Sequence, residues 1–235
     1  MARQALPSPN HDQRPPGVRP SLLILHYTGM SSGRAAIARL RDPEARVSAH
    51  YVIDENGAVI ALVPEERRAW HAGIAGWRSL DDINSHSIGI ELVNPGHEWG
   101  YRPFPDVQIA ALTELGAAIR ARHAMAPEAV LGHSDVAPGR KTDPGELFPW
   151  AELARHGLGV WPQVATSDPI DAASALHRLG AIGYRFDLPN TVPVQVVAAF
   201  QRHWRPALVD GSLDAETATL IDAVARLCGR VEEPT

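Results

Sequence analysis

Two side chains that can bind a metal ion stand close together in the stretch Gly132–Gly145. His133 and Asp143 supply one imidazole and one carboxylate, and the prolines and glycines among them exclude a regular helix or strand. A rigid loop of this kind can bring both side chains to one point. The apolar run Ala129–Leu131 predicts a short buried strand, so His133 is expected at a strand end, where α/β proteins place ligand sites. The stretch therefore predicts half of a metal site.

His26 is the candidate for a third metal ligand. It ends the apolar run Leu22–Leu25 as His133 ends its own run, a parallel that two neighbouring strands would explain. A catalytic zinc typically takes three protein ligands of the His, Asp, Glu or Cys type and leaves the fourth position to water. A single histidine at a strand end is more often a core or surface residue, so the spacing alone leaves the structural interpretation open.

Glu91 is an acid inside an apolar strand that is expected over residues 87–94. Alternation along this strand places Gly89, Glu91 and Val93 on one face and the larger apolar residues on the other. Unpaired acids are seldom buried, so Glu91 is expected either to have a partner or to do chemistry.

Residues 64–86 show no regular period and carry Trp70 and His71, which favours a structured loop over a cleft. His71 is a candidate substrate contact, and structural packing between tryptophans explains it equally well. Four other histidines show no paired ligand spacing and are expected to be structural or exposed: His50, His86, His97 and His123.

Hydrophobic period and caps predict the elements that position these side chains. An apolar first strand is expected over residues 21–26, a helix from Ser31 or Ser32 to about residue 40, and a hairpin whose strands cover 47–53 and 58–63. Asp106 is expected to cap a long helix to about residue 122. A strand over 129–132 and a short helix over 150–156 follow.

Gly157–Pro162 and the polar stretch after it indicate a linker, and the remainder predicts three short helices. Asp168, which precedes a proline, is expected to start the first helix, and Gly180 to stop it. Apolar spacings of three and four up to Trp204 define the second, and Asp214 caps the third. So short a segment forms only a small core, so it is expected to dock on the rest of the chain.

Composition limits the partners and the compartment. The chain has 22 Lys and Arg against 27 Asp and Glu, and its net charge of −5 argues against nucleic acid or an anionic membrane surface as the main partner. The only cysteine, Cys228, excludes an intrachain disulfide and a cysteine-rich metal site. No apolar run reaches about 18 residues, so no membrane span is expected.

Five prolines and the lack of an apolar signal region predict a flexible Pro-rich leader over residues 1–20. The corresponding expectation is a cytoplasmic protein, or a periplasmic one if a signal has been removed.

Five ordered blocks of the sequence carry a family resemblance: Leu25–Thr28, Ser48–Ile53, Ala69–Gly73, Ser87–Leu92 and Gly132–Gly145. They resemble, in that order, the zinc N-acetylmuramoyl-L-alanine amidases of the AmpD type. Phe148–Trp150, Gly159–Pro162 and the tail with Asp210–Asp214 are similar to the two-domain AmiD branch of that family. The resemblance covers nearly the whole chain from Ser21 on.

This resemblance implies an α/β fold with a central mixed β-sheet flanked by helices and a small C-terminal three-helix domain. It divides the chain into the leader (1–20), a zinc amidase catalytic domain (21–162) and a helical peptidoglycan-binding-like domain (163–235). The helical domain either binds glycan or braces the catalytic domain, and its few aromatic side chains favour bracing.

By the same resemblance, one zinc ion per chain is held by the ligands His26, His133 and Asp143. Glu91 is implied as the catalytic acid or base and Lys141 as the partner of the oxyanion, although a solvated charge is the ordinary role of a loop lysine. The resemblance also implies substrate contacts at Tyr27, Trp70 and His71.

The implied reaction is hydrolysis of the amide between N-acetylmuramic acid, including its anhydro form, and L-alanine of the stem peptide, for cell-wall turnover and recycling. A muropeptide or peptidoglycan substrate is then the expected partner, and no required protein partner is evident. The alternative is a non-catalytic peptidoglycan recognition protein. Such proteins generally lack part of the zinc set, so the complete set in this chain favours an enzyme.

Overall fold

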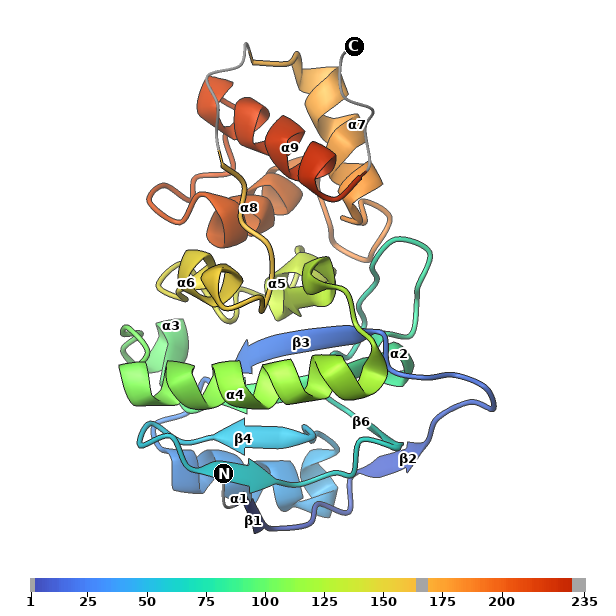
Figure 1. Cartoon of the computed structure of the whole chain (residues 1–235), viewed down its shortest axis with the longest axis vertical. Coiled ribbons are helices and arrows are strands. Elements are labelled where there is room, and N and C mark those ends of the chain that lie inside the picture. Colours follow the sequence, from blue (N-terminus) through green and yellow to red (C-terminus); the bar gives the residue numbers. More distant parts are fainter. Residues whose placement is uncertain (1–2, 164–168, 230–235) are drawn as a thin grey trace.

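The computed structural model describes residues 3–163 and 169–229, and its centre is a mixed sheet (Figure 1). The strands of this sheet are β1 (Arg3–Ala5), β3 (Leu22–Tyr27), β4 (Tyr51–Ile53), β5 (Val59–Ala61), β7 (Ser87–Leu92) and β8 (Val130–Gly132). Their spatial order is β1-β5-β4-β7-β3-β8, and only the β4–β5 hairpin is antiparallel. A separate antiparallel pair joins β2 (His11–Gln13) to β6 (Arg67–Ala69). The predicted α/β fold with a mixed sheet is confirmed.

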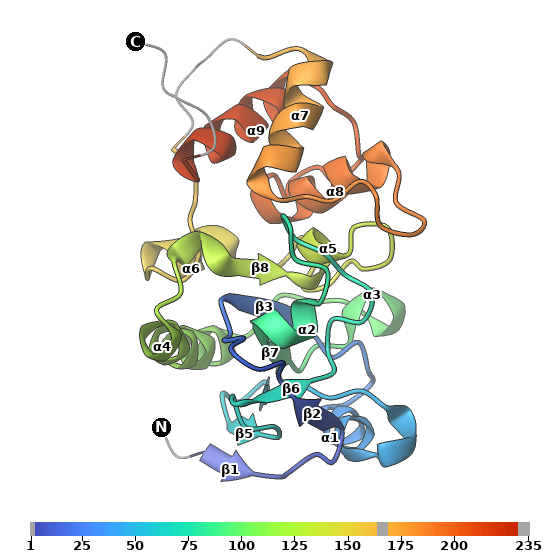
Figure 2. The same cartoon turned by 90° about the vertical axis from the view of Figure 1, so that its right-hand side faces the viewer.

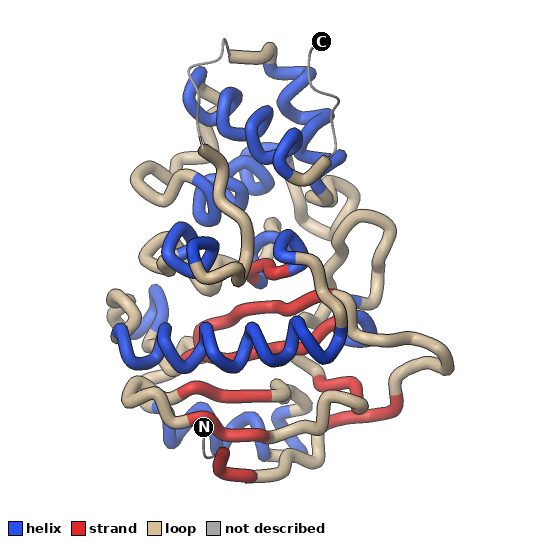
Figure 3. The backbone as a smooth tube through the Cα atoms, viewed as in Figure 1, coloured by secondary structure: helices blue, strands red, loops and turns tan. Residues whose placement is uncertain are grey.

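Helices cover both faces of the sheet and one of its edges. In Figure 2, α4 (Asp106–His123) lies on one face, and α1 (Gly33–Arg41) and α3 (Gly96–Trp99) lie on the other. Shorter segments are α2 (Ile83–His86), α5 (His133–Val136), α6 (Trp150–Arg155) and the 3-10 turns Pro43–Ala45 and Pro127–Ala129. The last helices, α7 (Ala172–Ile182), α8 (Pro193–Trp204) and α9 (Ala215–Leu227), lie beyond β8 (Figure 2), in the upper part of Figure 3, which holds helices and loops and no strand in the part of the chain that is described. No helix among the described residues is long and apolar enough to cross a bilayer.

Strand β3 alternates between two cores, and this alternation aims His26. Leu23 and Leu25 are fully buried under α4, whereas Leu22 and Ile24 face a second core. His26 continues the second series, because successive side chains of a strand point to opposite faces. The strand therefore directs His26 to the face opposite α4.

The predicted N-cap of α1 and the predicted β4–β5 hairpin are both present, whereas α4 begins one residue earlier than predicted. Ser32 caps α1 by accepting a hydrogen bond from a backbone N–H, and the β4–β5 hairpin turns through Gly57 with φ 81°. Asp106 was predicted to cap α4, but Pro105 holds that position and Asp106 is the first helical residue. There its carboxylate still faces the positive end of the helix dipole.

The prediction of a flexible leader is wrong for residues 3–14. Strand β1 pairs with β5 and β2 pairs with β6. Buried Asn10 donates through its side-chain amide to the carbonyls of Asp42 and Val47, at 2.8 Å each. Arg14 donates to four backbone carbonyls between Glu65 and Ser87 at 2.6–3.2 Å. Prolines exclude a helix here, but they allow extended segments to pair at the edge of a sheet.

The three predicted C-terminal helices are present, with one start and one end displaced. Asp214 caps α9 as expected. The predicted first cap, Asp168, lies outside the described residues, and Asp171 caps α7. Gly180 does not stop α7, since the helix continues to Ile182 and ends at Gly183 with φ 145°. A glycine inside a helix costs only about 1 kcal/mol relative to alanine, so the surrounding packing overrides it.

One continuous apolar core joins the C-terminal helices to the sheet. Leu22 and Leu131 from strands β3 and β8 share this core with Leu179, Phe200 and Val224 from the last three helices. The helices thus cover the β8 edge of the sheet, which would otherwise be open to pairing with another chain.

Candidate metal centre and active site

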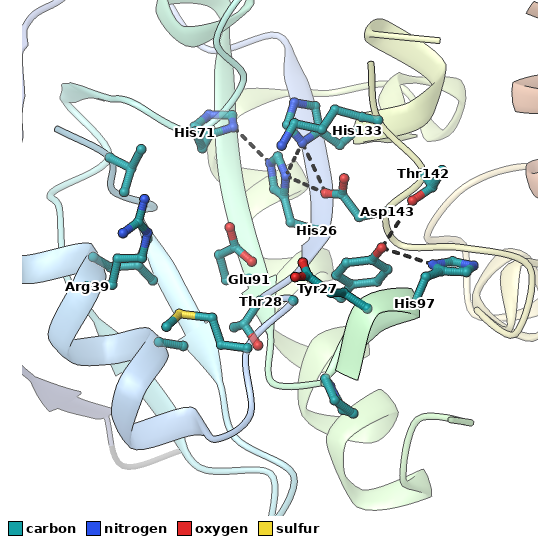
Figure 4. A pocket seen from close by; sticks show the side chains of 18 of the residues that line it. His26, Tyr27, Thr28, Arg39, His71, Glu91, His97, His133, Thr142 and Asp143 are labelled. Carbon is teal, nitrogen blue, oxygen red and sulfur yellow. Dashed lines mark hydrogen bonds and ion pairs between the residues drawn. The ribbon is translucent and has the colours of Figure 1, made fainter. Parts of the chain in front are cut away.

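A cleft of about 430 Å³ opens on the face of the sheet opposite α4 (Figure 4). Its walls come from the end of β3, from α1, from β7, and from the loops that follow β6 and α5. All eight residues singled out in the sequence line it: His26, Tyr27, Trp70, His71, Glu91, His133, Lys141 and Asp143.

The structure brings His26, His133 and Asp143 to one point on the cleft wall. The Nδ1 atoms of the two histidines are 2.9 Å apart, and each is 3.0 Å from Oδ2 of Asp143. All three side chains are buried. Parallel pairing of β3 with β8 explains the approach, because it sets the carboxyl ends of both strands side by side.

A chain of hydrogen bonds fixes which nitrogen of His26 faces this point. Ser87 Oγ donates to the carbonyl of Ile83 (2.6 Å), so it accepts from His71 Nε2 (3.1 Å). His71 Nδ1 is then an acceptor, and His26 Nε2 donates to it at 3.0 Å. This network places the ring proton of His26 on Nε2 and leaves a bare lone pair on Nδ1.

His133 has the same tautomer for a simpler reason. Its Nε2 lies 3.0 Å from the carbonyl oxygen of Ala72, which can only accept, so Nε2 carries a proton, and in the neutral ring that metal binding requires Nδ1 is then bare. With both rings neutral, two nitrogen lone pairs and one carboxylate oxygen converge with no proton among them. Such an arrangement calls for a cation, and hydrogen bonds on the remote ring nitrogens are usual for histidines that bind metals.

The donor set fits a tetrahedral zinc site. Metal–ligand bonds of about 2.0–2.1 Å place the ligand atoms of such a site roughly 3.3 Å apart. The observed separations of 2.9–3.0 Å are slightly shorter than that. Two imidazole nitrogens with one carboxylate oxygen also match the ligand types of catalytic zinc sites, which leave a fourth position open.

Burial and neighbouring groups keep His26 and Asp143 in the protonation states that a metal requires. Burial and the neighbouring His133 lower the pKa of His26 to about 4, so this imidazole is neutral at pH 7. Burial raises the pKa of Asp143, but His133 and His26 outweigh it and hold that pKa well below its usual value. Asp143 is accordingly ionised.

Glu91 lies beside the cluster with an unsatisfied carboxyl oxygen. It is the register partner of His26 across the parallel β3–β7 pair, and Figure 4 shows it next to that side chain. Its Oε2 is buried without a hydrogen-bond partner. Burial and the carboxylate of Asp143 raise the pKa of Glu91 well above its usual value, against the opposing charge of Lys141. A half-buried acid with a raised pKa in a cleft is suited to proton transfer.

Residues 16–146 match the family model described as N-acetylmuramoyl-L-alanine amidase. The chain belongs to the N-acetylmuramoyl-L-alanine amidase family. The chain is therefore an enzyme, and the non-catalytic alternative is not favoured.

Relatives of the amidase match in both sequence and structure. This chain is 39% identical to the N-acetylmuramoyl-L-alanine amidase AmiD of Escherichia coli K12 over 90% of its own length and 84% of the length of AmiD. A structure of Escherichia coli AmiD with the substrate anhydro-N-acetylmuramic acid-L-Ala-D-gamma-Glu-L-Lys superposes with a TM-score of 0.80 at 38% identity, covering 93% of this chain and 94% of that one. AmpDh3 of Pseudomonas aeruginosa gives 0.80 at 36% identity, with coverage of 91% and 94%.

The helical tail places the amidase with the two-domain relatives. The 1,6-anhydro-N-acetylmuramyl-L-alanine amidase AmpD of Enterobacter cloacae is 34% identical but matches only 63% of this chain and 86% of its own length. AmiD matches through the tail as well. The predicted resemblance to the AmiD branch is confirmed.

Hydrogen bonds within the amidase occupy two of the side chains expected to contact substrate. Tyr27 Oη is bonded to His97 Nδ1 (3.0 Å) and Thr142 Oγ1 (3.1 Å). Both ring nitrogens of His71 are used within the protein, towards His26 and Ser87. Trp70 differs, since its indole Nε1 is buried without a partner.

Sequence reasoning missed several residues that hold the site in place. Arg140 donates to the carbonyls of Ala72 (2.6 Å) and Ile74 (2.8 Å), which clamps the loop after β6 to the loop of Asp143. Gly89 leaves the space that the His71 ring fills, because a Cβ there would lie 2.5 Å from that ring. His97 is exposed, as expected, and it also lines the cleft. Only the glycine inside an apolar strand could have signalled such a close approach.

Proposed function

We propose that the amidase binds one zinc ion through His26, His133 and Asp143 and cleaves the amide between N-acetylmuramic acid, or its anhydro form, and L-alanine of the stem peptide. The convergence of two bare Nδ1 atoms and one carboxylate oxygen supports the metal site. When bound, zinc polarises the scissile carbonyl and lowers the pKa of a coordinated water.

Glu91 moves the protons of the reaction. Its unpaired Oε2 and raised pKa allow the carboxyl group to take a proton from the attacking water and to hold it. It then delivers that proton to the leaving amine, since an amide nitrogen leaves only when it is protonated. Glu91 is on β7, the strand next to the one that carries His26, so the proton-transferring carboxyl group and the proposed metal ligand lie on the same side of the cleft.

Lys141 stabilises the negative charge that develops on the carbonyl oxygen. It lies on the cleft wall in the same loop as Asp143, and its backbone N–H donates to the carbonyl of Ala137 (3.0 Å). A cation held beside a developing oxyanion in a partly dehydrated cleft stabilises the transition state more than the ground state.

The remaining cleft residues divide into orienting and contacting groups. His71 orients His26, because both of its nitrogens are used within the protein. Tyr27 and Trp70 also line the cleft, and their rings are the proposed contacts with the glycopeptide. We propose that this catalytic domain spans residues 21–162, with residues 3–14 packed on it, and that a helical domain covers 163–235.

The anhydro form enters the proposal through two relatives. The solved complex of Escherichia coli AmiD contains anhydro-N-acetylmuramic acid-L-Ala-D-gamma-Glu-L-Lys, and the Enterobacter cloacae AmpD is named for the anhydro sugar. A muropeptide released during wall turnover is thus the substrate to test first, with recycling of the wall as the role.

Metal analysis of His133→Ala tests the proposal. We expect about one zinc per chain in the wild type and loss of both zinc and muramoyl-L-alanine amidase activity in the variant. His156→Ala is the matched control, because His156 is exposed and does not line the cleft. Full zinc occupancy and unchanged activity in His133→Ala would rule out the proposed site.

A further inference from the structure

Asp135 is a fully buried acid at the boundary between the metal loop and the C-terminal helices. It is 0% exposed and lies in α5, two residues after His133. Its carboxylate accepts three hydrogen bonds, each of 2.7 Å: from the backbone N–H of Gly132, from Tyr184 Oη and from His203 Nδ1. A buried carboxylate is tolerated only when it is satisfied in this way.

The C-terminal helical domain supplies two of these three donors. Tyr184 follows α7 and His203 is in α8, respectively 49 and 68 residues after Asp135. The third donor, Gly132, immediately precedes the ligand His133. The carboxylate therefore ties the backbone on one side of His133 to side chains of another domain.

Aromatic packing holds both donors in place. The His203 ring is stacked between Trp150 and Trp204, with centroids 3.7 and 4.0 Å away. Tyr184 packs edge-on against Trp77 with a centroid distance of 5.0 Å. Burial and the Asp135 carboxylate raise the pKa of Tyr184 well above its usual value, so the phenol keeps the proton that it donates.

The same domain meets the metal loop at a second point. A Cβ at Gly139 would lie 2.6 Å from the backbone oxygen of Asn190 and 2.6 Å from Thr191 Oγ1. These two residues precede α8. The loop from His133 to Asp143 thus touches the helical domain near its start and again in its middle.

We propose that Asp135 is a positioning residue through which the C-terminal helical domain sets the geometry of the loop that carries His133 and Asp143. This inference rests on the proposed zinc site. Disturbing the contact should let the loop relax and move the two ligands apart, although neither of them is altered. The helical domain then acts on catalysis through this loop.

Tyr184→Phe tests this proposal in the full chain, because it removes one hydrogen bond to Asp135 and keeps the aromatic ring. We expect the zinc affinity, measured by competition with a chelating dye, to fall by about tenfold, the lower end for residues that support metal ligands. The visible absorption spectrum of the cobalt-substituted protein should shift, and kcat should fall more than KM rises. Asp135→Asn should show larger changes of the same kind.

Val224→Ala is the matched control. Val224 is a fully buried residue of α9 in the same apolar core, and its side chain makes no polar contact. It should lower Tm while leaving zinc affinity and the cobalt spectrum at wild-type values.

The double variant Tyr184→Phe with Asp135→Asn decides whether the tyrosine acts through the aspartate. Zinc affinity should then fall no further than in Asp135→Asn alone.

Wild-type zinc affinity, cobalt spectrum and kcat in Tyr184→Phe, with only Tm lowered, would overturn the proposal and leave Asp135 a purely stabilising residue. If Asp135→Asn fails to fold, the comparison of Tyr184→Phe with Val224→Ala still decides. A wild-type chain that binds no zinc would instead refute the proposed metal site.

Discussion

Two acids packed against the same sheet, Glu91 in the cleft and Glu65 beside α4, have opposite surroundings. Burial raises the pKa of both carboxyl groups. At Glu65, hydrogen bonds from Arg122, Tyr51 and His123 outweigh burial and bring the pKa to about 2. At Glu91, Oε2 has no partner and the pKa stays high.

The two surroundings give the two carboxyl groups different roles: Glu65 stabilises the fold, and Glu91 remains available for proton transfer. The carboxylate oxygens of Glu65 accept hydrogen bonds from the end of α4 and from Tyr51 on the first strand of the hairpin. Its charge therefore contributes to the stability of the native state. Glu91 has only a partly opposing lysine charge, so its proton can be exchanged with a substrate. Swapping either acid for its amide should therefore change one property and spare the other.

The largest expected effect is the loss of turnover in Glu91→Gln. We expect kcat to fall by about 100- to 10,000-fold, since general acid–base catalysis typically contributes that much. Bound zinc should be retained and Tm should not fall, because Oε2 has no hydrogen bond to lose. Turnover of an anhydro-muropeptide, metal analysis and a melting curve on one preparation measure all three. A wild-type rate would show that Glu91 is only a structural carboxylate.

The second effect is on stability and concerns Glu65→Gln. The difference between a pKa of 4.5 and one of about 2 corresponds to a loss on the order of 3 kcal/mol in the free energy of unfolding at pH 7. The turnover number at 25 °C should stay at the wild-type value, because Glu65 is not on the cleft wall. Denaturant unfolding beside the activity assay checks both. A variant as stable as the wild type would remove the contrast between the two acids.

The third and smallest effect is the pH dependence of that stability. A folded-state pKa below the unfolded value gives stabilisation that is complete above about pH 4.5 and is lost as the pH falls towards 2. The stability difference between the wild type and Glu65→Gln should therefore be constant above pH 5 and shrink between pH 4.5 and 2. Urea unfolding at a series of pH values measures it. A difference that is constant over the whole range would show that Glu65 does not titrate with folding.

Local patterns in the sequence predicted the elements that carry the site. The apolar runs before His26 and His133 gave both strands, because a strand buried on two faces needs an unbroken apolar segment. The Asn-Gly turn predicted the hairpin, and the capping residue Asp214 predicted the start of α9. These signals act over a few residues, so a single sequence contains them.

The remaining features depend on contacts between distant segments. Asp135 has the sequence context of a solvated loop charge, and two of its donors are 49 and 68 residues away. His71 can bond to His26 because Gly89 has no side chain in the space that the His71 ring fills, and no periodic pattern in the sequence reveals this approach. Gly180 carries a local stop signal that tertiary packing overrides. Pairing and packing at such separations decide where these residues lie.

The ties of the N-terminal segment also bear on the order in which the amidase assembles during its synthesis. The carbonyls that accept from Arg14 belong to residues 51 to 73 positions later in the chain, and β1 pairs with the second strand of the hairpin. A ribosome that adds about 5–20 residues per second needs roughly 3–15 s to supply those partners. The N-terminal segment is therefore synthesised before its partners, and β1, β2 and Arg14 close onto a sheet that later residues have begun to form.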